Sequence, residues 1–109
     1  MIGMASSPID QAKLRQDVLS DGKEDYTGLY EIVWSLNTQY PDVSRDLKIA
    51  AARAIVADLL NEGHVALYRT VWASNNYEPV PQKDALGVLG PPAAWEDPSD
   101  QPYICYAAA

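Results

Sequence analysis

The residue types that most often do covalent chemistry are scarce in this sequence, which contains one histidine, His64, and one cysteine, Cys105. A thiol beside an imidazole base can act as a nucleophile, so this pair is the first candidate for a catalytic site. No orienting group or sequence signature accompanies it. His64 follows a predicted helix end, where it can interact with the negative end of the helix dipole, and a cysteine among aromatic residues is typical of a small packed apolar side chain. We therefore expect no catalytic residues and no enzymatic activity.

Metal and cofactor chemistry has equally little support. One cysteine and one histidine cannot assemble a zinc cage. Glu96 and Asp97 could bind a metal or do acid–base work, but adjacent acids beside a proline are typical of a solvated loop. The glycines match neither GxxxxGK[ST] nor GxGxxG, so nothing predicts a bound nucleotide. We expect no cofactor and no metal.

Tyrosine and tryptophan are the most informative residue types here, because they anchor protein interfaces and also fill ordinary cores. One predicted helix carries aromatic residues at i, i+4 and i+8, on a different side from its aliphatic stripe. This second stripe needs a partner surface, either within the chain or on another protein. The candidate protein-binding residues are Tyr26, Tyr30, Trp34, Trp72 and Trp95. Packing beneath the C-terminal segment and an exposed partner or dimer surface both remain open for this set, to which Tyr68 also belongs.

Charge narrows the class of partner. The 109 residues include eight basic and fifteen acidic side chains, which give a formal net charge of -7 at pH 7. Such a balance repels nucleic-acid phosphates and anionic lipid surfaces, and it favours a basic partner. The sequence has no apolar run long enough to span a membrane, and residues 1–10 lack the features of a secretory signal. A lone cysteine favours a reducing compartment, so we expect a cytoplasmic protein.

Three helices are predicted in the first two thirds of the chain. The first covers residues 8–19, with Ser7 as its cap and a break at Asp21 and Gly22. The second begins after a cap at Asp25 and stops before Pro41. The third begins at Ser44 and ends at Gly63, without an internal glycine or proline to break it.

A β-hairpin and an irregular segment should follow. Residues 64–72 alternate as a strand, Ser74 to Asn76 favour a turn, and residues 77–80 can return as a short strand. Residues 82–109 contain Pro91, Pro92, Pro98 and Pro102, which favours an irregular tail after a short helix at 83–89. The prediction is a single α+β domain over 1–109, mainly helical, with its core in 8–81 and the tail packed on that core.

The order of these elements resembles a winged helix-turn-helix domain. The stretch LNTQYPDVSRDLKIAAARAIVADLLNEGHVALYR looks like a helix, a turn, a longer helix and the wing strand. More closely, DYTGLYEIVW, then ARAIVADLLNEGHVALY, then a tryptophan before DP in an acidic tail, resembles a family of small bacterial proteins without assigned function. The resemblance implies a winged-helix-like fold and leaves the activity open, because a fold does not fix a function.

A DNA-binding winged helix needs donors on the exposed side of its third helix and cations on the wing. The candidate phosphate contacts are Arg45, Lys48 and Arg53, but the wing tip at residues 74–76 has neither lysine nor arginine. The first interpretation is therefore a non-enzymatic binding or regulatory protein that acts by protein contact or self-association, for which an immunity-type inhibitor of a basic toxin is a concrete example. A DNA-binding regulator is the alternative, and an enzyme using the single histidine and cysteine is the third.

Overall fold

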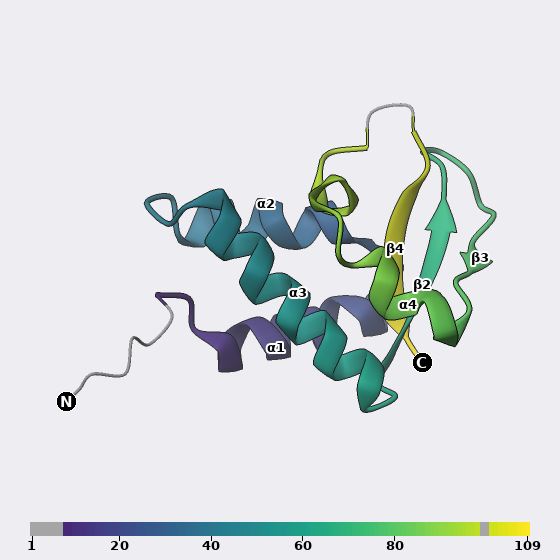
Figure 1. The fold of residues 1–109 in the computed structure, drawn as a ribbon, viewed down its shortest axis with the longest axis horizontal. Coiled ribbons are helices and arrows are strands. Elements are labelled where there is room, and N and C mark those ends of the chain that lie inside the picture. The colour runs from purple at the N-terminus through teal and green to yellow at the C-terminus, as the bar shows by residue number, and fades with distance from the viewer. Residues whose placement is uncertain (1–7, 99–100) are drawn as a thin grey trace.

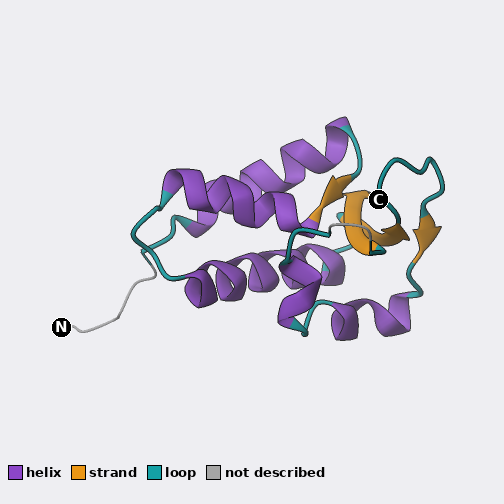
Figure 2. Ribbon diagram, turned by 90° about the horizontal axis from the view of Figure 1, so that it is seen from above, coloured by secondary structure: helices purple, strands orange, loops and turns teal. Residues whose placement is uncertain are grey.

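The longer helices lie toward one end of the molecule and an antiparallel sheet toward the other, with a shorter helix beside the sheet (Figures 1 and 2). The computed structural model describes residues 8–98 and 101–109. In this part of the chain the elements are, in order, α1 (Gln11–Glu24), β1 (Thr27–Gly28), α2 (Leu29–Gln39), α3 (Arg45–Asn61), β2 (Val65–Thr70), β3 (Glu78–Pro79), α4 (Gln82–Val88), the 3-10 helix η1 (Pro92–Trp95) and β4 (Tyr103–Ala108). The α+β class expected from the sequence is confirmed.

The first helix is longer and starts later than predicted. Its cap is Asp10, whose carboxylate accepts a hydrogen bond of 3.0 Å from the Lys13 amide, while the predicted cap Ser7 lies outside the described residues. The predicted break at Gly22 is wrong, since α1 continues to Glu24. Gly22 is buried in close contact with the ring of Tyr106, so the missing side chain allows helix and strand to approach each other.

The second and third helices follow the sequence prediction closely. α2 ends before Pro41 as expected, but its N-cap is Gly28 and not Asp25, because β1 lies between them. α3 begins after Ser44, whose hydroxyl accepts a hydrogen bond of 3.3 Å from the Leu47 amide. Gly63 ends this segment with φ of 79°, a backbone conformation that glycine adopts without strain.

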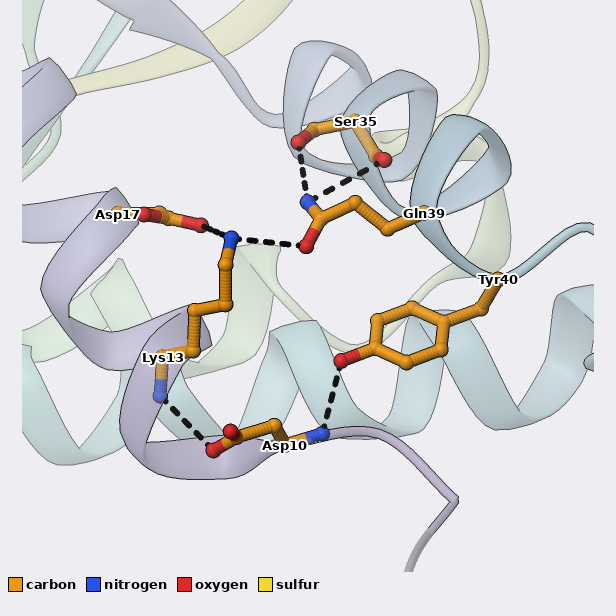
Figure 3. A network of polar contacts seen from close by, with 6 residues as sticks. All are labelled: Asp10, Lys13, Asp17, Ser35, Gln39 and Tyr40. Atoms are coloured by element: carbon orange, nitrogen blue, oxygen red, sulfur yellow. Dashed lines mark hydrogen bonds and ion pairs between the residues drawn. The ribbon is translucent and has the colours of Figure 1, made fainter.

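A network of polar contacts joins the start of α1 to the end of α2 (Figure 3). The Lys13 ammonium donates to Asp17 at 2.8 Å and to the Gln39 side-chain oxygen at 2.9 Å. The Tyr40 hydroxyl accepts from the Asp10 amide at 3.1 Å. These contacts are exposed, so they add little to the free energy of unfolding and mainly orient α1 relative to α2.

The sheet contains the largest departure from the prediction. Its strand order is β1-β4-β2-β3, and β4 pairs with β2 over six residues, from Val65 opposite Ala108 to Thr70 opposite Tyr103. Residues 82–109 therefore do not end as an irregular tail, because their final segment is a central strand. The prolines do limit regular structure, but only up to Pro102, which directly precedes β4.

The predicted hairpin is present in a reduced form. β3 pairs with β2 at only two positions, Tyr68 opposite Pro79 and Arg69 opposite Glu78. Between the two strands, the Ser74 amide donates a hydrogen bond of 3.1 Å to the Val71 carbonyl, which closes a turn with Trp72 and Ala73 at its centre. Ala73 has φ of 65°, in the left-handed region that non-glycine residues rarely adopt.

The main core lies between the helices and one face of the sheet. It draws on every helix and on the C-terminal segment, so it is not confined to residues 8–81 as predicted. Trp95 of η1 is 1% exposed and donates its indole N–H to the Leu89 carbonyl at 2.9 Å. Tyr106 of β4 is fully buried in the same core.

Candidate protein-binding surface

One face of the sheet packs against the main core, and the other does not. Residues paired across antiparallel strands share a face, and successive residues alternate between faces. Leu67 and its partner Tyr106 point into the main core. Tyr68 and its partner Cys105, like Thr70 and its partner Tyr103, therefore lie on the opposite face. Cys105 is buried on this outer face, although it is not part of the main core.

What covers the outer face is a set of aromatic rings, which we call the aromatic face. Two chains of ring contacts make it up. Tyr26 stacks on Tyr77, with centroids 3.8 Å apart and planes 5° from parallel, and meets Tyr68 edge-on at 5.1 Å. Tyr30 makes edge-on contacts with Trp34 at 4.8 Å and with Tyr103 at 5.6 Å. The aromatic face consists of Tyr26, Tyr30, Trp34, Tyr68, Tyr77 and Tyr103.

The absence of a side chain at Gly28 allows the ring of Tyr30 to lie close to β1. Gly28 of β1 is in close contact with the ring of Tyr30, and a Cβ atom at this position would overlap that ring.

Beneath the rings, burial raises the pKa of the Cys105 thiol to about 12, with smaller contributions from the nearby charges of Glu31 and Asp25. A thiol with this pKa stays protonated at neutral pH, and a protonated thiol is a poor nucleophile.

A pocket of about 390 Å³ opens at the edge of the aromatic face, where the end of α1 meets the start of α2. Two of its walls are partly exposed rings, Tyr26 at 39% and Trp34 at 50%. Four carboxyl groups and a threonine complete the lining, namely Asp21, Glu24, Asp25, Glu31 and Thr27.

The carboxylates of this pocket have no cationic partner among residues 8–98 and 101–109. The Lys and Arg ion pairs of this part of the chain involve other acids, Asp17 with Lys13 and Glu62 with Arg15, and the His64 imidazole lies 3.4 Å from the same Glu62 carboxylate. Partial burial, together with the charges of Asp17 and Glu24, raises the pKa of Asp21 above its ordinary value. The pocket is therefore a region of uncompensated negative charge beside aromatic rings.

The sequence-predicted aromatic candidates separate into three groups. Tyr26, Tyr30 and Trp34 come together in the aromatic face, with Tyr30 buried beneath its neighbours. Trp72 is 63% exposed at the turn between β2 and β3 and takes part in none of the ring contacts of the described residues. Trp95 belongs to the core, so its prediction as a binding residue is wrong: its indole fills space beneath η1 and is hydrogen-bonded there.

The three candidate DNA contacts are not presented together. Lys48 is 4% exposed, and its ammonium donates to the Asn37 side-chain oxygen at 2.9 Å. Arg53 donates to the carbonyl groups of Leu89 and Gly90, at 2.9 and 2.8 Å, which ties α3 to the segment after α4. Only Arg45 remains exposed at the start of α3.

The histidine and the cysteine do not form a pair. His64 directly precedes β2, and its carbonyl accepts from the Ala109 amide, whereas Cys105 lies opposite Tyr68. Four residues along β4 separate these positions, which corresponds to about 13 Å at the usual rise of a strand. In the described ranges no group of three or more His, Cys, Asp or Glu residues is placed to hold a metal ion. No described helix combines the length and the apolar character that crossing a membrane requires.

Sequence reasoning missed two members of the aromatic face, Tyr77 and Tyr103, and all four pocket acids. Tyr77 follows a turn and Tyr103 follows a proline, so neither stands in a periodic pattern. A usable signal was present for the acids. Residues 21–31 contain four of them, none with a base four residues away: Asp21, Glu24, Asp25 and Glu31. The juxtaposition with the rings is tertiary and needs the structure.

Comparison with known proteins adds no relative: no family model, no curated protein and no solved structure matches this chain.

Proposed function

We propose that this protein is a non-enzymatic binding module that contacts a protein partner through the aromatic face. The observation that carries the proposal is the half-exposed indole of Trp34, held edge-on against buried Tyr30 at the rim of a tyrosine-covered sheet. Tryptophan and tyrosine are the residues that most often dominate the binding energy of protein interfaces. Rings that are already fixed by their neighbours lose little side-chain freedom on binding, which favours affinity.

The charge of the surface favours a basic partner. The four carboxylates of the pocket border the aromatic face, and the whole chain carries a net charge of -7. Complementary charge accelerates association and selects among partners. An immunity-type inhibitor of a basic toxin remains the concrete example of such a function, and self-association is the alternative use of the same rings.

We further propose that the scaffold is winged-helix-like. Its support is the order α1, β1, α2, α3, β2, β4, with β4 placed between β1 and β2 in the sheet. Between β2 and β4 the chain inserts α4 and η1, and Arg53 of α3 is bound to the carbonyls of Leu89 and Gly90 in this insertion. A DNA-binding regulator would use the exposed side of α3, so this contact weakens the DNA alternative.

Site-specific photo-crosslinking tests the protein-contact proposal. A photoreactive phenylalanine analogue is placed at Trp34, and the protein is irradiated in native lysate. The matched control carries the same analogue at Leu86 of α4, which is 52% exposed against 50% for Trp34. We expect a discrete adduct from position 34 and none of the same mass from position 86.

The adduct mass also distinguishes the two uses of the surface. An adduct of twice the mass of the chain identifies self-association, whereas any other discrete mass identifies a foreign partner. No discrete adduct from position 34, or the same adducts from both positions, contradicts the proposal.

A further inference from the structure

The aromatic walls of the pocket are fixed in place while remaining open to solvent. Tyr26 is stacked on Tyr77 and braced edge-on by Tyr68, and Trp34 is braced edge-on by Tyr30. The faces of such rings carry negative electrostatic potential, which attracts a cation placed over them. The pocket is therefore lined by two aromatic rings that are held by their neighbours and still partly exposed.

Two of the four carboxylates are also fixed. The Asp25 carboxylate accepts a hydrogen bond of 2.7 Å from the Tyr26 amide, and the Glu31 carboxylate accepts one of 2.6 Å from the Gly28 amide. Each carboxylate has further lone pairs that these single bonds do not use. Oriented carboxylate acceptors and aromatic rings thus line one small space, and both attract a cationic group.

We infer that this pocket binds the guanidinium group of an arginine side chain carried by the partner, an inference that rests on the proposed protein-contact function. Charge complementarity selects a cation. Arginine is favoured over lysine because its planar group stacks on aromatic rings and donates several hydrogen bonds at once to carboxylates. A metal ion is a poor alternative, since the described acids form no cluster placed to coordinate one.

The three tryptophans provide the readout. The protein is labelled with nitrogen-15 and titrated with a blocked arginine amide, while the indole N–H resonances are followed by NMR. Trp34 reports on the pocket, Trp95 is a buried internal control, and Trp72 is an exposed control at a different place. We expect the Trp34 resonance to move in a saturable manner, and the other two to stay in place.

Matched ligands and variants test the chemistry. The blocked amide of citrulline has the shape of arginine without its charge, and we expect no saturable shift from it, whereas lysine amide should bind more weakly than arginine amide. Glu24→Gln should weaken arginine binding about two- to fivefold, the range for one exposed charge pair. Glu96→Gln removes the same charge from another exposed position and should leave binding unchanged.

Three results would overturn the inference: equal shifts from citrulline and arginine, equal affinity for lysine and arginine, or equal effects of Glu24→Gln and Glu96→Gln. Failure here is separable from failure of the proposed function. If the Trp34 resonance does not shift with arginine but position 34 still crosslinks, the protein-contact proposal is supported and the arginine pocket is refuted. If Trp34 responds to arginine but no crosslink forms, the guanidinium pocket stands and the protein-partner proposal fails.

Discussion

The hydroxyl of Tyr106 donates a hydrogen bond of 3.0 Å to the carbonyl of Val18, across 88 residues of sequence. Both residues are buried, and the ring of Tyr106 lies directly against Gly22 one turn further along α1. This contact fixes the distance between α1 and β4. It also explains why a glycine is found inside a helix, where it would otherwise be unfavourable.

Gly22→Ala should therefore destabilise the protein, although alanine is the better helix former. The new Cβ would lie 2.9 Å from Cε2 of Tyr106, so the buried ring or the helix must shift. We expect a loss of about 1–3 kcal/mol in the free energy of unfolding, measured by urea denaturation. Gly87→Ala is the matched control, because α4 has open space there, and it should stabilise by about 0.4–1 kcal/mol. Equal effects of the two substitutions would refute the close-contact explanation.

Trp95→Ala and Trp72→Ala should differ sharply in their effect on stability. Trp95 is a fully buried ring whose removal leaves a cavity and an unmade hydrogen bond to Leu89, so we expect a loss of about 3–5 kcal/mol. Trp72 is 63% exposed, and its removal should change stability by no more than about 0.5 kcal/mol. Thermal or urea unfolding of both variants checks this, and similar losses would show that the turn at Trp72 supports the fold.

Stability should fall in alkaline solution. Burial raises the pKa of Cys105 and of Tyr30 to about 12 and raises that of Tyr106 further, whereas these groups ionise near 9 and 10 in the unfolded chain. Above about pH 9 the native state therefore holds more protons than the unfolded state, and its stability is lost as the pH rises toward these folded pKa values. Urea denaturation across this range measures the slope. Cys105→Ala should make the slope shallower, and an unchanged slope would contradict the assignment of the thiol.

Binding to DNA should be absent at physiological ionic strength. Arg45 is the one exposed cation among the three candidate contacts, and a single phosphate contact cannot overcome the repulsion from a net charge of -7. Anisotropy of a labelled mixed-sequence duplex, first at low salt and then near physiological salt, measures this. Salt-sensitive binding that Arg45→Ala and Arg53→Ala abolish would revive the DNA-binding alternative.

The elements that the sequence predicted well are those with local start and stop signals. Ser44 and Gly63 delimit α3 correctly because a cap and a left-handed glycine act within one turn of the chain. β4 was missed because its pairing partners, in β1 and β2, are far away in sequence. The length of α1 was underestimated because Gly22 is explained only by Tyr106, which no local rule connects with it.

The part of the candidate site that follows a local sequence pattern was predictable, and the part built by strand pairing was not. Tyr26, Tyr30 and Trp34 follow one another at a helical spacing, and their common side could be recognised, although only Tyr30 and Trp34 lie within α2 itself. Tyr77 and Tyr103 reach the same surface through the pairing of β3 and β4 with β2, which sequence periodicity does not encode. Trp95 was misassigned because composition alone does not separate a core tryptophan from an interface tryptophan.

β4 is the last strand to be synthesised, although it lies between β1 and β2 in the sheet. A ribosome makes the helices and both flanking strands before residues 103–108, so the nascent chain carries two strand edges with an empty place between them. Unpaired edges of this kind are where a foreign strand adds. The interval before β4 emerges is therefore when this chain is most exposed to aggregation, and when a chaperone that covers strand edges would protect it most.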